Sequence, residues 1–147
     1  MHVSRTVWAL STALPFISAE FQVLQTGLLA NESSVFLSDG CTAAMESSIL
    51  CDQWLQDNAN EDGYSYLNDT ALNALCPPAC EPSIKSYRSK VISACQNDPQ
   101  PFDGLPAEYF IDVIWASYNL TCLKDPKSGD YCNSRILPLQ YTHRDNM

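Results

Sequence analysis

The chain has 147 residues and a formal charge of -9, from 8 lysines and arginines against 17 aspartates and glutamates. This length fits one domain, and 46% hydrophobic residues can form a small core, which argues against wholesale disorder. So acidic a chain lacks the basic stripe that binds nucleic acid or an anionic membrane surface, and neither partner is expected.

Residues 1–19 are typical of a secretory signal peptide. A short region ending at Arg5 carries one positive charge, and an uncharged apolar stretch follows from Val7 to Ala19. This stretch is shorter than the ~20 apolar residues that span a bilayer, and it has the length of a signal-peptide core. The alternative is a buried N-terminal helix. We expect a secreted, extracellular protein with no membrane association after cleavage.

Two further features agree with secretion. Three sequons for N-glycosylation are present, at Asn31, Asn68 and Asn119. Seven cysteines in so short a chain are typical of an extracellular domain that disulfides stabilise, because its core is too small to be strongly stable by burial alone.

The chain after the signal peptide divides into three parts. Residues 20–40 show poor periodicity and are interpreted as an N-terminal lead-in. Residues 41–132 contain every cysteine and form the predicted cysteine-rich helical module. Residues 133–147 are polar and are interpreted as a loose C-terminal tail.

Apolar residues of the module recur every three to four positions, which is the helical period. The first predicted helix covers residues 43–56. After a loop at 60–66, a short second helix follows, capped by Asp69 or Thr70 and ended by Pro77 and Pro78.

Two longer helices complete the predicted module, separated by a loop over 97–106. Pro82 suits the first turn of one helix, and Pro106 opens the other. A turn is predicted over 125–130. The predicted apolar faces consist of Ile84, Tyr87, Val91, Ile92 and Cys95 in the first helix and Tyr109, Phe110, Val113, Ile114 and Tyr118 in the second. We therefore expect a small, mostly all-α, loop-rich, disulfide-stabilised single domain, although several short apolar runs are also compatible with strands.

The cysteines favour disulfides over metal or redox chemistry. No second close pair accompanies Cys76 and Cys80, which argues against structural zinc, and no Cys-x-x-Cys motif is present. Their odd number leaves one thiol over, and the sequence does not determine the pairing, although Cys41–Cys51 and Cys122–Cys132 are attractive as local loops. The seven candidates are Cys41, Cys51, Cys76, Cys80, Cys95, Cys122 and Cys132.

No arrangement of side chains marks a catalytic centre, so we expect no enzyme activity, cofactor or metal. The only histidines, His2 and His143, argue against Ser-His-Asp or Cys-His catalysis. A glycoside hydrolase needs two carboxylates held across a cleft, whereas the acidic clusters here are interpreted as solvated loops. These clusters contain Asp57, Glu61, Asp62, Asp98 and Asp103.

Two tryptophans of the module, Trp54 and Trp115, are candidates for glycan contact. An indole ring suits the C–H-rich face of a sugar, although aromatic side chains more often fill cores and interfaces.

Several runs of the module resemble a cysteine-rich module of secreted fungal proteins. That module often accompanies LysM domains, which bind chitin and related N-acetylglucosamine polymers. The resemblance covers roughly residues 41–135. The runs that carry it are Tyr118-Asn-Leu-Thr-Cys-Leu-Lys-Asp-Pro126, Ser128-Gly-Asp-Tyr-Cys132, Leu75-Cys-Pro-Pro-Ala-Cys-Glu-Pro-Ser-Ile84 and Val91-Ile-Ser-Ala-Cys95, together with the pair Cys41 and Cys51.

Two departures limit what the resemblance implies. Ser128-Gly-Asp-Tyr-Cys132 is similar to the opening of some LysM repeats, but only 15 residues follow Cys132, so no repeat is present. Chitin binding is therefore not carried over to particular residues. The relatives also tend to continue to a Cys-Ser-x-Cys-Tyr segment that this chain lacks, so a truncated piece of a longer LysM protein is an alternative reading.

The resemblance implies a secreted, non-enzymatic fungal protein that acts at the cell wall or host surface, with a role in chitin-type glycan recognition. The alternative is a protein-binding effector or hydrolase inhibitor that uses rigid loops such as 57–66 or 97–105, because little ordering entropy is lost when such loops dock. The expected partner is accordingly a cell-wall glycan or a secreted or host protein.

Overall fold

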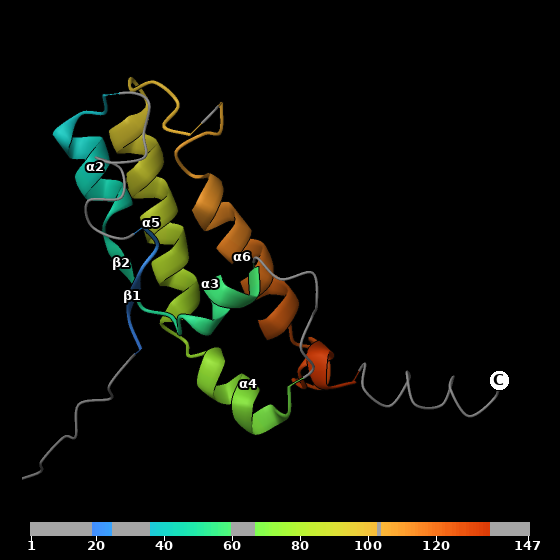
Figure 1. The fold of residues 1–147 in the computed structure, drawn as a ribbon. Helices are drawn as coiled ribbons and strands as arrows, with labels where there is room; N and C mark the ends of the chain where they lie inside the picture. The colour runs from blue at the N-terminus through green and yellow to red at the C-terminus, as the bar shows by residue number, and fades with distance from the viewer. Residues whose placement is uncertain (1–18, 25–35, 60–66, 103, 136–147) are drawn as a thin grey trace, which may run out of the picture.

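The computed structural model describes residues 19–24, 36–59, 67–102 and 104–135. Two long helices, α5 and α6, run antiparallel, and shorter elements pack around them (Figure 1). The expected small, mostly helical, disulfide-bonded single domain is confirmed. In chain order the elements are β1 (Phe21–Gln22), α2 (Asp39–Met45), β2 (Ser48–Ile49), α3 (Trp54–Ala59), α4 (Asp69–Leu75), α5 (Cys80–Cys95) and α6 (Tyr109–Cys122).

Some expectations fall outside the described residues. They are the signal peptide up to residue 18, the sequon at Asn31, the loop 60–66 and the tail from residue 136 onward. Among the described residues, no helix is long and apolar enough to cross a bilayer.

Helix α5 forms much as its sequence predicts, with Pro82 in its first turn. Ile84, Tyr87, Val91 and Cys95 are buried in the core. The placement of Ile92 on the same face was wrong, because its side chain is 38% exposed. At ~100° per residue, position 92 is rotated well away from the centre of the buried stripe.

The predicted apolar face of α6 was partly wrong. Of the predicted residues only Ile114 is fully buried, and Tyr109 is exposed. Helix α6 packs against α5, α3 and α4, and these neighbours together determine which of its sides is covered. The buried positions of α6 are Ile111, Ile114, Ser117 and Thr121.

Three disulfides form, and each joins distant parts of the chain: Cys41–Cys95, Cys51–Cys80 and Cys76–Cys122. The suggested local pairs Cys41–Cys51 and Cys122–Cys132 are therefore wrong. Cys132 is the cysteine left free, and it is half-buried.

The pairing explains why the helix predicted over 43–56 is interrupted. Cys80 and Cys95 are the two ends of α5 and so lie ~22 Å apart at 1.5 Å per residue. A continuous helix from Cys41 to Cys51 would span only ~15 Å. The chain reaches both bridges because α2 is followed by the extended strand β2.

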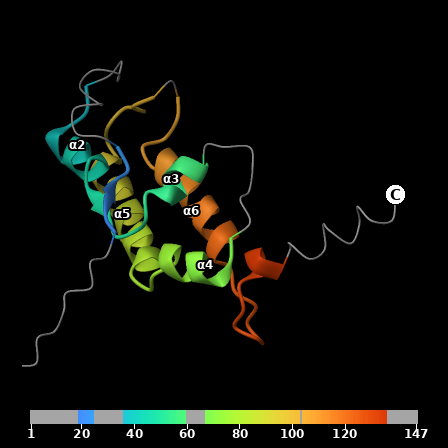
Figure 2. The same ribbon diagram turned by 60° about the horizontal axis from the view of Figure 1, so that its bottom comes forward.

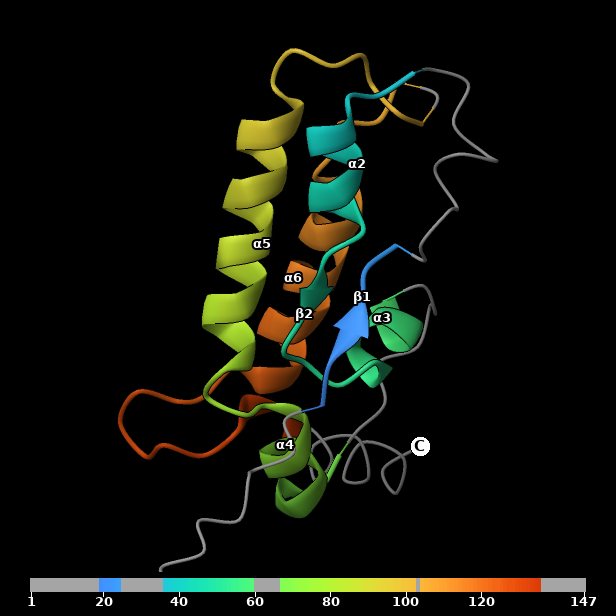
Figure 3. The same ribbon diagram turned by 90° about the vertical axis from the view of Figure 1, so that its left-hand side faces the viewer.

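Strand β1 corrects the view of residues 20–40 as a lead-in outside the module. It pairs antiparallel with β2, with Phe21 opposite Ile49. Phe21, Val23 and Leu24 are buried in the core. Figure 3 shows the two strands and α2 lying along one side of α5, with α6 behind.

Helix α4 begins at a different cap from the one expected. Asn68, not Asp69 or Thr70, accepts the hydrogen bond from the backbone N–H of Ala71. The helix ends at Leu75, before Pro77, as predicted.

The C-terminal part of the described chain folds back toward α4 (Figure 2). Lys124 and Tyr131 form a bridge across the predicted turn, in which Gly129 takes a positive φ of 76°. The Tyr131 hydroxyl donates to Asn73 at 3.1 Å, and Asn133 accepts from the backbone N–H of Leu67 at 3.0 Å. Asn133 is buried, so the loose tail does not begin at residue 133 as expected.

We expect the folded, secreted protein to contain one titratable thiol, at Cys132. The physical reason is that the other six cysteines lie within bonding distance of their partners. Thiol counting under denaturing, non-reducing conditions tests this, and a Cys132→Ser variant should give none. Four or more free thiols in secreted wild-type protein would contradict the three disulfides.

Candidate functional site

Helix α5 presents three faces, and one of them is open. Its first face is the core face already described. Its second face points toward α6 through Glu81, Lys85 and Arg88. At ~100° per residue, Ala79, Pro82, Ser83, Ser86 and Lys90 fall on a third face, roughly opposite the second.

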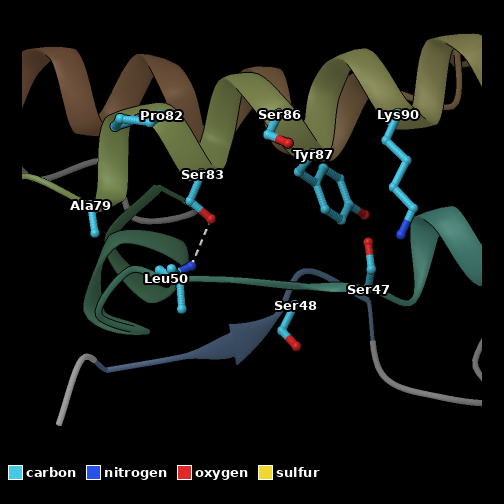
Figure 4. A pocket seen from close by; sticks show the side chains of 9 residues that line it. All are labelled: Ser47, Ser48, Leu50, Ala79, Pro82, Ser83, Ser86, Tyr87 and Lys90. Carbon is cyan, nitrogen blue, oxygen red and sulfur yellow. Dashed lines mark hydrogen bonds between the residues drawn. The ribbon is translucent and has the colours of Figure 1, made fainter. Parts of the chain in front are cut away.

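This third face forms one wall of a groove, which we call the serine groove. Its other wall is the extended segment 47–50, and its volume is about 480 Å³. Eleven helical steps from Ala79 to Lys90 make the groove ~16 Å long. Figure 4 shows Lys90 and Ser47 at one end and Ala79 and Leu50 at the other. The lining residues are Ser47, Ser48, Leu50, Ala79, Pro82, Ser83, Ser86, Tyr87 and Lys90.

Three oxygens in the groove are already engaged by the protein. The Ser47 hydroxyl donates to the carbonyl of Ala44 at 2.6 Å, and the Tyr87 hydroxyl donates to the carbonyl of Met45 at 2.5 Å. Burial raises the pKa of Tyr87 well above its usual range, so its proton stays in place. Ser83 instead accepts from the backbone N–H of Leu50 at 2.8 Å (Figure 4).

Other polar groups in the groove have no partner within the described chain. They are the hydroxyls of Ser48 and Ser86, both exposed, and the ammonium group of Lys90. A serine hydroxyl offers one donor and two lone pairs, and a lysine offers three donors. The groove therefore presents donors and acceptors to a ligand along its length.

Lys90 also stands out by its charge. Between residues 6 and 123, the only lysines and arginines of the sequence are Lys85, Arg88 and Lys90. Lys85 pairs with Glu81 at 2.7 Å and Arg88 with Asp112 at 2.6 Å. No described carboxylate pairs with Lys90, so its charge is available to a ligand.

Trp115 lies outside this groove, on the side of α6 that faces α5. Its ring stacks on Tyr118, with centroids 5.8 Å apart, and the ammonium group of Lys85 lies 5.3 Å from its centroid. Burial, and then the charge of Glu81, raises the pKa of Tyr118. A sugar that stacked on Trp115 on the side of this ammonium would have to displace the Lys85 side chain.

Trp54 lies on a different element, at the first position of α3. Its backbone N–H donates to Asp52 at 2.9 Å, and its half-buried ring packs against the core. Trp54 does not stack on Trp115, because the ring that stacks there belongs to Tyr118. The two predicted glycan contacts do not form one platform, and neither lines the serine groove.

Two of the sequons lie in the described chain, and both asparagines are exposed. Asn68 caps α4 through its carbonyl oxygen. Asn119 is on the surface of α6, whereas Thr121 of the same sequon is buried.

The acidic residues of the described chain have structural or solvent-facing positions. Asp98 accepts from the backbone N–H of Ser38 at 2.6 Å and from its hydroxyl at 2.9 Å, which ties the loop after α5 to the start of α2. Asp57 is exposed, and Glu61, Asp62 and Asp103 lie outside the described residues. Within the described ranges, no group of three or more His, Cys, Asp or Glu side chains is placed to hold a metal ion.

The sequence gives no signal for the serine groove. Its serines come from two segments more than 30 residues apart, and a serine in a sequence does not by itself indicate a binding site. The two walls are brought together by contacts between distant residues, among them the disulfide Cys51–Cys80 and the hydrogen bond between Leu50 and Ser83.

Comparison with known proteins identifies relatives. The family described as secreted LysM effector N-terminal domain matches residues 21–143. The chain is 31% identical to "Non-secreted LysM effector LysM19" of Penicillium expansum over 101 residues. This alignment covers 68% of this chain and 8% of that protein. The chain is also 38% identical to a secreted LysM effector of Pochonia chlamydosporia over 65 residues. That alignment covers 42% of this chain and 10% of that protein.

A third relative is a "LysM domain-containing protein" of Arthroderma benhamiae, 31% identical over 101 residues, or 67% of this chain and 18% of that protein. The chain thus spans less than a fifth of the length of each of these relatives. No solved structure matches significantly.

Proposed function

The chain belongs to the family of secreted LysM effector N-terminal domains, and from this premise we propose that it is a non-enzymatic extracellular module that takes part in recognising chitin-type glycans. It acts at the fungal cell wall or the host surface. The observation that carries the proposal is the family match over residues 21–143, which includes all the described elements. The cysteine-rich resemblance noted in the sequence is thereby confirmed.

Weak binding by the module alone fits its shape. The serine groove is open, and none of its described lining residues is an exposed aromatic, so few contacts exclude water from a ligand. A weak site gains strength when it is linked to a second one, because the second binding event becomes intramolecular and can raise overall affinity by ~10²–10⁴. The module therefore acts best beside other glycan-binding units.

A retention assay tests the proposal. We expect the secreted protein to be retarded on insoluble chitin or fungal cell walls, and to release no reducing sugar from either. A tandem fusion of two copies should be retarded more strongly than one copy. Passage of both forms through the matrix without retardation would refute the glycan role, and release of sugar would refute the non-enzymatic role.

One observation favours a second candidate, a protein-binding effector or hydrolase inhibitor. The loop between α5 and α6 contains Pro99, Pro101 and Pro106 and is fastened by Asp98 to Ser38. It presents an exposed Leu105. Rigid loops lose little entropy on docking. Recovery of one specific secreted or host protein, with no glycan retention, would favour this candidate.

We expect secretion from a eukaryotic host to remove roughly residues 1–19 and to add glycan at Asn119 or Asn68. The charged start, the short apolar stretch and the exposure of both asparagines support this. Intact mass before and after deglycosylation measures it. Suitable controls are Thr70→Ala, which removes one sequon while keeping the Asn68 cap, and Asn119→Gln, which spares the buried Thr121. An unprocessed, glycan-free chain would contradict secretion.

A further inference from the structure

We propose that the serine groove binds a short stretch of a linear, uncharged oligosaccharide, with Lys90 and Ser86 among its contacts. This inference deepens the proposed function and rests on it, because it identifies the surface that would contact the glycan. The groove has a volume of about 480 Å³, within the ~300–1,000 Å³ typical of ligand sites. Its length of ~16 Å suits an extended chain rather than a compact ligand.

The exposed lining of the groove is mostly apolar, and the polar groups set within it indicate a ligand with both donors and acceptors. Ser47 has committed its proton to a backbone carbonyl, so toward a ligand it acts as an acceptor, whereas the hydroxyl of the buried Tyr87 stays bonded to Met45. Ser83 has committed a lone pair to Leu50, so its proton is free to donate. A sugar hydroxyl both donates and accepts, and therefore can satisfy either kind of group.

The same arrangement disfavours an anionic ligand. A carboxylate or sulfate accepts only, and at the Lys90 end it would face the lone pairs of Ser47 as well as the ammonium group. The net charge of the chain, -9, repels anions further. Lys90 instead donates hydrogen bonds to neutral oxygens, as a charge-assisted donor does.

An extended peptide is disfavoured by the backbone geometry. Strand addition uses a row of unpaired backbone N–H and C=O groups at a sheet edge. Strand β2 has only two residues, and the next backbone N–H, at Leu50, is already bonded to Ser83. The groove offers side-chain hydroxyls where a peptide would need backbone groups.

The test compares matched substitutions of residues that line the serine groove and residues of α5 that do not, in the full secreted chain. Lys90→Ala removes a donor from the groove, and Lys85→Ala removes the same residue type from the face toward α6. Ser86→Gln fills the groove, whereas Ser89→Gln places the same side chain elsewhere on the exposed surface of α5. None of these four residues belongs to the buried core, so all variants should fold, which circular dichroism checks.

Binding is followed by NMR titration with chitotetraose and cellotetraose as neutral probes. Tetragalacturonate serves as the anionic probe, and an extended uncharged tetrapeptide as the peptide probe. We expect a neutral sugar to shift the resonances of Ser48, Leu50 and Ser86. Lys90→Ala should weaken this binding about tenfold, since a hydrogen bond to a charged group is lost, and Ser86→Gln should abolish it. Lys85→Ala and Ser89→Gln should leave it unchanged.

Three outcomes would overturn the proposal. One is binding only of the anionic or the peptide probe, which would assign the groove to another ligand class. Another is loss of sugar binding in Lys85→Ala or Trp115→Ala but not in Lys90→Ala, which would assign the sugar to the face toward α6. The last is wild-type retention on chitin that Ser86→Gln does not alter, in which case the glycan role stands and the groove proposal fails.

Discussion

Replacement of Cys41 and Cys95 together by alanine should lower the free energy of unfolding by about 4 kcal/mol. The Cys41–Cys95 bridge closes a loop with a sequence separation of 54, and the chain-entropy estimate for a loop of this length is ~4 kcal/mol. Small domains are stable by only ~5–15 kcal/mol, so this loss removes a large share of the total free energy of unfolding. Urea denaturation of secreted wild-type and variant protein measures the difference.

The control for this experiment is Cys132→Ser, which removes a thiol but no bridge. It should change the free energy of unfolding by less than ~1 kcal/mol, because the residue is only half-buried and unpaired. A Cys41→Ala, Cys95→Ala variant as stable as this control would refute the Cys41–Cys95 pairing.

Ile84→Ala and Ile92→Ala should differ sharply, although both residues are isoleucines on α5. Ile84 is fully buried and its truncation leaves a cavity, so we expect a loss of about 2–5 kcal/mol. Ile92 is 38% exposed, and alanine is the better helix former, so the loss there should be below ~1 kcal/mol.

Thermal melts followed by circular dichroism separate these two isoleucine variants. Equal losses in both would mean that the buried face of α5 is centred elsewhere than on Ile84 and Val91. A smaller loss in Ile84→Ala than in Ile92→Ala would mean that α5 is rotated about its axis.

Helix α5 was predictable because its signals are local. Pro77 and Pro78 end the preceding helix, Pro82 suits the first turn, and the spacing from Ile84 to Cys95 follows the helical period. The turn over 125–130 was predictable for the same reason, since Asp125 and Gly129 are typical turn residues.

The segment from Cys41 to Leu55 was not predictable, because its conformation is determined by distant partners. Met45 and Ile49 are four residues apart, which is a helical spacing, yet Ile49 lies in a strand that interrupts the segment, and both side chains are fully buried. The interruption follows from bridges to the two ends of α5, and a pattern of residues contains no information about which cysteines pair.

The candidate site was the least predictable part. The sequence pointed to Trp54 and Trp115 by residue type alone. In the structure both side chains pack against the core, and the ring of Trp115 also contacts Tyr118 and Lys85. The serine groove exists only where β2 lies beside α5, so its residues become neighbours after folding.

The three bridges overlap along the sequence, and this overlap affects how the chain withstands proteases. Cys41–Cys95 spans one stretch, Cys76–Cys122 spans a second that begins inside the first, and Cys51–Cys80 lies across part of both. A single peptide bond hydrolysed anywhere between Cys41 and Cys122 therefore leaves both halves covalently joined. A molecule cut once in this span gains one water but loses no fragment, and the two parts stay at high effective concentration. A protease must therefore cut more than once between Cys41 and Cys122, or await reduction, before it can release a piece from that span.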